Sequence, residues 1–235
     1  MKRFLAVLAI VAFFAGCVPV DSLNPLYADK DIVFDASLLG EWVDPGATDD
    51  GSLKFNKEGD NAYQIIMTET NGGEVKRTFY HGHLVAIGNY RFLDIVPQNW
   101  EARRDSYVLH LGQTKDGSKI QPRLLKLGEA AYMEFTGDNA DAKGAKLRAQ
   151  LRPAHWFLKV QTDGKKLRLS FIDDDNFRKA IEQGKFHIGN ALLGDGKARD
   201  VVLTADTKEL QKFILDHAND EALFAAHLDE LQRKP

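Results

Sequence analysis

The chain has 235 residues, of which 44% are hydrophobic and 28% charged, and its formal net charge is -3. This composition is typical of a folded globular protein with a sizeable core, and it excludes a disordered chain. It also excludes nucleic-acid binding, which needs clustered positive charge. The basic doublets at 103–104 and 165–166 are too short to supply that charge.

The N-terminus has the order of a secretory signal. Lys2 and Arg3 precede an apolar run of twelve residues, Phe4 to Ala15, which is followed by Gly16 and the single cysteine, Cys17. A membrane-spanning helix needs about 20 apolar residues, so a short uncleaved membrane helix is the less favoured alternative. We therefore expect residues 1–16 to be a signal peptide that is removed.

Phe14-Ala15-Gly16-Cys17 resembles the lipobox of bacterial lipoproteins, although Phe14 stands where Leu is usual. The resemblance implies that Cys17 is acylated and that this lipid attaches the protein to a membrane of the cell envelope. In bacterial lipoproteins the residue after the acylated cysteine affects membrane sorting. Val18 at this position resembles the lipoproteins that are sent to the outer membrane, where they face the periplasm. Lipidation uses the only thiol, so we expect neither disulfides nor thiolate chemistry.

The next segment has two prolines and little periodicity, which predicts a lipidated tether at 17–31 and a single β-rich domain at 32–235. Asp35 precedes what looks like one capped helical turn at 36–39. Gly40 can end this turn with a positive φ angle, and Trp42 then opens the first strand.

Strand signals dominate the middle of the chain. Gly88-Asn89 and Asp163-Gly164 each connect two apolar runs, as hairpin turns do. Many short strands at close spacing predict a mainly β fold (α+β by count), either an antiparallel barrel or a strongly bent sheet. The expected strands lie at 53–55, 63–67, 75–87, 90–96, 107–111, 124–127, 131–135, 156–161, 167–172 and 201–204.

Helices are expected towards the C-terminus. Asp175 can cap a helix at 177–183, and Asp206 with Glu209 resembles the capping box of a second helix. The apolar spacing within 224–231 predicts a terminal helix.

Two resemblances bear on the family. Several stretches of this chain resemble a set of uncharacterised bacterial lipoproteins and secreted proteins that have no assigned activity. Gly40-Glu41-Trp42 also resembles the Gly-x-Trp signature of lipocalins, in which the Trp closes the base of an eight-stranded barrel. The alternative is a structural tryptophan in another β fold. The stretches shared with the uncharacterised set are Asn24-Pro25-Leu26-Tyr27, Leu39-Gly40-Glu41-Trp42, Phe92-Leu93-Asp94, Val202-Leu203-Thr204 and Glu209-Leu210.

Two groups of side chains are candidate metal ligands. His81 and His83 share one face of an expected strand, as a metal site requires, with His110 or Glu74 as a possible third ligand. The favoured alternative is a polar, solvent-facing strand. Residues 173–175 are three aspartates, but a calcium loop needs alternating ligands and a glycine, so a helix cap is favoured. We therefore expect no metal site.

The catalytic signals are equally weak. His155 lacks a nucleophile in any familiar motif, and the chain has no Gly-x-Ser-x-Gly elbow, no His-Glu-x-x-His and no phosphate-binding loop. We expect a structural His155, no cofactor and no enzyme activity. Trp100, Arg103 and Arg104 are residue types of interface hot spots, although a loop with Trp100 folded back on the body is favoured.

Two functions remain open. The first is an envelope lipoprotein with a non-catalytic interaction module, which should have a filled interior and an exposed apolar patch. The alternative is a lipocalin-like carrier of a small hydrophobic ligand, which should enclose an apolar pocket of roughly several hundred Å³. The sequence names neither ligand-binding residues nor a particular protein partner.

Overall fold

The computed structural model describes most of the chain after residue 18. The described ranges are 19–46, 51–71, 73–98, 120–127, 130–137, 147–150, 155–172, 174–193, 200–220, 223–224, 226–227 and 230–234. The signal segment, Cys17 and the expected strand at 107–111 lie outside these ranges, as do His110, Trp100, Arg103 and Arg104.

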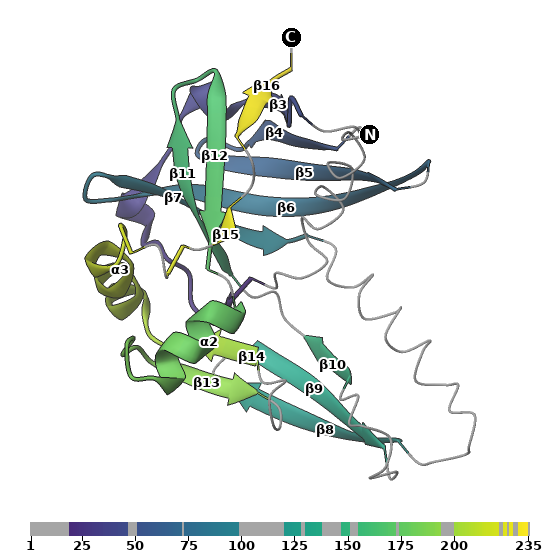
Figure 1. Cartoon of the computed structure of the whole chain (residues 1–235), viewed down its shortest axis with the longest axis vertical. Coiled ribbons are helices and arrows are strands. Elements are labelled where there is room, and N and C mark those ends of the chain that lie inside the picture. The colour runs from purple at the N-terminus through teal and green to yellow at the C-terminus, as the bar shows by residue number, and fades with distance from the viewer. Residues whose placement is uncertain are drawn as a thin grey trace, which may run out of the picture.

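Eight antiparallel strands form a closed barrel (Figure 1). Each strand pairs with the next in the order β11-β7-β6-β5-β4-β3-β16-β12, and pairing of β12 with β11 closes the ring. The expected antiparallel barrel is therefore confirmed. Its strands are β3 (Gly40–Val43), β4 (Ser52–Glu58), β5 (Ala62–Asn71), β6 (Glu74–Ile87), β7 (Tyr90–Pro97), β11 (Trp156–Thr162), β12 (Lys166–Phe171) and β16 (Leu231–Arg233).

The remaining described elements lie beside the barrel. The short strands β2 (Ile32–Val33) and β15 (Ala226–His227) pair with β6 and β12. One three-stranded sheet contains β8 (Ile120–Leu127), β9 (Ala130–Gly137) and β10 (Leu147–Gln150). Another contains β1 (Asp21–Ser22), β14 (Asp200–Leu203) and β13 (Asn190–Leu193). The helices are α2 (Asp174–Glu182), α3 (Thr207–Asp216) and the 3₁₀ turns η1 (Asp29–Asp31) and η2 (Ala36–Leu38).

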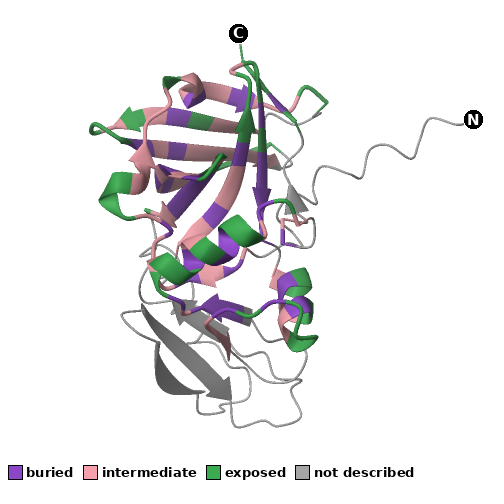
Figure 2. Ribbon diagram, turned by 90° about the vertical axis from the view of Figure 1, so that its left-hand side faces the viewer, coloured by how far each residue is buried: buried purple, intermediate pink, exposed green. Residues whose placement is uncertain are grey.

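Barrel strands β6 and β7 are buried on both faces where residues 84–85 pair with residues 92–93. Leu84 and Leu93 belong to the core inside the barrel. Their sequence neighbours Val85 and Phe92 belong to a second core outside it, which also contains apolar side chains of α2 and α3. The two helices accordingly bury one face each and expose the other (Figure 2). This double burial explains why these strands have continuous apolar runs rather than strict alternation.

The expected tether is wrong for the part of it that the structure describes. Val20 is 3% exposed and Leu26 is fully buried. Strand β1 pairs in parallel with β14, and the Leu26 N–H donates a hydrogen bond of 2.7 Å to Asp94 Oδ2. The prolines prevent a helix here but not an extended segment, which packs through its apolar side chains and satisfies its backbone through neighbouring strands.

The expected terminal helix is also wrong. Residues 226–227 and 231–233 are the strands β15 and β16, so His227 lies on a strand. Strand β16 fills the gap between β3 and β12, and Leu231 is 8% exposed in the barrel core. Pairing with two open strand edges outweighs a helical spacing of three apolar residues, because intrinsic helix propensity is a weak preference.

Candidate functional site

Trp42 lies at the end of the barrel that η2 covers, where it is fully buried. Its indole N–H donates a hydrogen bond of 2.8 Å to the Leu38 carbonyl at the end of η2. The guanidinium of Arg233, on β16, lies 4.6 Å from the centre of the indole ring and donates to the carbonyls of Ser37 and Leu39. The expected burial of Trp42 at the first barrel strand is therefore confirmed.

The local sequence explains how η2 is held in place. The Asp35 side chain accepts a hydrogen bond of 2.8 Å from the Ser37 N–H, which caps the turn as expected. The Tyr63 hydroxyl accepts from the Asp35 N–H at 2.7 Å. Gly40 then takes a φ of 116°, which permits the chain to enter β3 directly. Trp42, Tyr63 and Leu38 thus fill and close this end.

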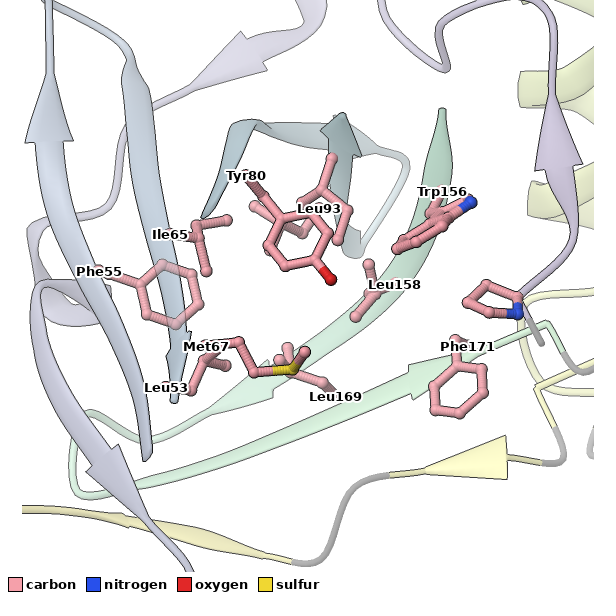
Figure 3. A pocket seen from close by; sticks show the side chains of 12 residues that line it. Leu53, Phe55, Ile65, Met67, Tyr80, Leu93, Trp156, Leu158, Leu169 and Phe171 are labelled. Atoms are coloured by element: carbon pink, nitrogen blue, oxygen red, sulfur yellow. The ribbon is translucent and has the colours of Figure 1, made fainter. Parts of the chain in front are cut away.

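A different part of the barrel interior contains an apolar pocket of about 50 Å³ (Figure 3). Side chains of β4, β5, β6, β7, β11 and β12 surround it, and none of its lining side chains is charged. Trp42, Leu38 and Tyr63 do not line it. The lining residues are Pro19, Leu53, Phe55, Ile65, Met67, Tyr80, Leu93, Ile95, Trp156, Leu158, Leu169 and Phe171.

Two of the aromatic residues that line the pocket have a polar atom. In Figure 3, the Tyr80 side chain points into the space between Met67 and Leu158. The indole nitrogen of Trp156 points away from the pocket and donates a hydrogen bond of 2.7 Å to Asp21 Oδ1. Trp156 therefore presents its apolar ring to the pocket while its one polar atom is already satisfied.

The pocket is much smaller than a lipocalin-like carrier was expected to have. About 50 Å³ is room for a narrow apolar group, whereas pockets for drug-sized ligands are typically about 300–1,000 Å³. Most of the barrel interior is filled by the large side chains of its core. Met67 is the adaptable part of the wall, because its unbranched side chain has several rotamers of similar energy.

His155 is held by hydrogen bonds through both its ring and its backbone. Its Nδ1 lies 2.7 Å from Asp94 Oδ1, and its backbone N–H and carbonyl both pair with Ser22. Asp94 is 2% exposed and binds Leu26 through its other oxygen, so it joins the N-terminal segment to β7. Burial raises the pKa of nearby Tyr27, and the charge of Asp94 raises it further. The sequence did not lead us to expect a role for Asp94, although an acidic residue inside the apolar run 92–96 was a signal that could have revealed it.

Asp175 does not cap α2 as was expected, because the helix already begins at Asp174. Residue 173 lies outside the described ranges. Asp174 is the first helical residue and accepts a hydrogen bond of 2.8 Å from the Val201 N–H, which connects α2 to β14. Asp175 lies inside the first turn and pairs with Arg178. Asp206 caps α3 as expected, by accepting from the Glu209 N–H at 2.8 Å.

His81 and His83 share one face of β6, as expected. Their Nε2 atoms lie 3.1 Å apart, and Nδ1 of His81 lies 2.8 Å from Glu58 Oε2. Glu74 is at the far end of β6 and does not join them. No group of three or more His, Cys, Asp or Glu in the described part of the chain is arranged to hold a metal ion.

No protein-family model matches this chain, and neither a curated protein nor a solved structure does. Within the described ranges, none of the helices has the length and apolar content needed to cross a bilayer.

Proposed function

We propose that this chain is a lipid-anchored protein of a bacterial cell envelope, whose barrel binds a slender apolar ligand such as an alkyl chain. The observation that carries the proposal is the apolar pocket inside the barrel. Each methylene group transferred from water into such a pocket contributes about 0.8 kcal/mol. A pocket of about 50 Å³ with no charged lining residue selects narrow, uncharged groups over bulky or ionic ones.

The exposed surface supports this proposal over the interaction-module hypothesis. Such a module should present an apolar patch to its partner. Among the described residues, the exposed large hydrophobic side chains are Val75 on β6 and Leu215 on α3. Val75 and Leu215 belong to different elements, and single exposed apolar residues are ordinary on protein surfaces. The carrier hypothesis is therefore the one we prefer.

The position of the anchor also supports the proposal. Pro19 lines the pocket and follows the expected acylated residue, Cys17, by two positions. Because Val20 is already buried in the body, little free chain separates the lipid from the barrel. Anchoring through Cys17 would hold the pocket close to the membrane surface, where alkyl chains are abundant.

Ligand binding can be tested with the chain from residue 17 onward carrying Cys17→Ser. In calorimetric titrations, fatty acids of increasing length should bind with increasing affinity. Leu158→Trp should fill the pocket and abolish fatty-acid binding without lowering the melting temperature. Leu215→Trp is the matched control, since Leu215 is 42% exposed on α3. Equal loss in both variants, or no fatty-acid binding by the parent, would contradict the proposal.

A further inference from the structure

His81 and His83 form a pair on the outer face of the barrel. They alternate along β6 with Tyr80 and Leu84, whose side chains are in the interior core. Successive residues of a strand point to opposite faces, so both imidazoles are on the outside. The side chain of His81 is 39% exposed, and the ring of Tyr27 lies 4.7 Å from the ring of His83. The pair is thus accessible to a small ion from solvent.

The hydrogen-bond partners of the two rings determine where their protons lie. Nδ1 of His81 faces the Glu58 carboxylate at 2.8 Å, and Nδ1 of His83 faces the Asn61 carbonyl at 3.3 Å. Both partners can only accept, which favours the tautomers with the proton on Nδ1. In the neutral rings each lone pair is then on Nε2. The two Nε2 atoms are 3.1 Å apart, and a cation between them would relieve the repulsion of these lone pairs.

The cation can be a shared proton or a metal ion, and these favour different ring placements. A straight N–H···N bond of this length would separate the ring centres by about 5.4 Å. If both lone pairs converge on a metal about 2.1 Å away, the ring centres lie about 4.8 Å apart and the N–metal–N angle is about 95°. The observed separation of the ring centres is 4.8 Å.

We propose that His81 and His83 bind a divalent transition-metal ion through their Nε2 atoms. An angle near 90° suits octahedral or square-planar coordination, which favours Cu²⁺ or Ni²⁺ over tetrahedral Zn²⁺. Glu58 and the Asn61 carbonyl hold the rings through Nδ1, as the outer partners of metal-ligating histidines do. The described protein groups supply two ligands, so water fills the remaining positions and the affinity is modest.

The test uses the chain from residue 17 onward with Cys17→Ser, which removes the competing thiol. Calorimetric titration with Ni²⁺ at pH 8 should give one site, and Cu²⁺ should give an electron paramagnetic resonance spectrum with coupling to two imidazole nitrogens. His81→Gln and His83→Gln should each weaken Ni²⁺ binding more than tenfold. Glu58→Gln should weaken it about tenfold by releasing His81. If His83→Gln fails to fold, the more exposed His81 and Glu58 variants still decide the question.

His187→Gln is the matched control, because His187 is an exposed histidine away from β6. Its Ni²⁺ affinity should equal that of the parent chain. An equal loss in this variant would mean that Ni²⁺ binds surface histidines without preference and would overturn the proposal. Absence of any site in the parent chain at pH 8 would also overturn it and assign the shared cation to a proton.

Discussion

Trp42→Ala tests how the closed end of the barrel is held together. The indole is fully buried among Leu38, Tyr63 and the Arg233 guanidinium, which are themselves fixed by hydrogen bonds or by the barrel core. Truncating a buried Trp to Ala costs about 3–5 kcal/mol, since rigid surroundings cannot collapse into the cavity. The Leu38 carbonyl also loses its donor, which costs about 1 kcal/mol more.

A domain of this kind holds about 5–15 kcal/mol in total, so the variant should lose a large part of its free energy of unfolding. Urea unfolding followed by circular dichroism is the suitable assay, because tryptophan fluorescence changes when Trp42 is removed. The slope of the free energy of unfolding against urea concentration should remain unchanged. A loss below about 1.5 kcal/mol would refute the idea that Trp42 closes the barrel.

Arg233 offers a second measurement on the same contact. A double-mutant cycle of Trp42→Leu with Arg233→Ala should give a coupling energy of about 0.5–1 kcal/mol, the size expected for a guanidinium over an aromatic ring. Val75→Ala is the control, since Val75 is 54% exposed. Zero coupling would mean that Arg233 acts only through the carbonyls of η2.

The remaining predictions concern the N-terminal segment, the barrel wall and the anchor. Leu26→Ala should lower the free energy of unfolding by about 2–5 kcal/mol because Leu26 is fully buried; a change under about 0.5 kcal/mol would restore the tether hypothesis. Asp94→Asn should cost about 1.5–3 kcal/mol, since an amide NH₂ must then face His155 or the Leu26 N–H; unchanged unfolding would refute that pairing. Gly82→Ala should cost about 1–3 kcal/mol, because its Cβ would lie 2.8 Å from Ile65 Cδ1; a neutral result would mean that the barrel interior repacks freely. Cys17→Ser in the host should abolish acylation and membrane partition, and an unchanged mature mass would contradict the lipid anchor.

The barrel strands could be predicted where local chemistry decides them. Tyr63, Ile65 and Met67 recur at every second position of β5, and Gly88-Asn89 makes the expected two-residue turn between Ile87 and Tyr90. Gly88 has a φ of 58°, which only glycine adopts without cost. The spacing of apolar residues and the identity of turn residues are local properties, so the sequence alone reveals them.

The barrel closure and the pocket could not be predicted in the same way. β16 is a strand because β3 and β12 leave a gap for it, and no residue near Leu231 indicates that gap. The pocket depends on strand register and twist, which place Met67, Tyr80 and Leu158 on a common interior surface. Which apolar residues face a cavity and which simply pack together is a tertiary property.

The order of the barrel strands along the chain has a consequence for folding. β16 contains residues 231–233, yet it is the strand that joins β3 to β12. Until these residues are in place, the other seven barrel strands can form only an open, curved sheet with β3 and β12 as its edges. Exposed edges of this kind are templates for pairing with other chains. A folding intermediate that lacks β16 is therefore prone to aggregation, and a chaperone that covers β3 or β12 would protect it.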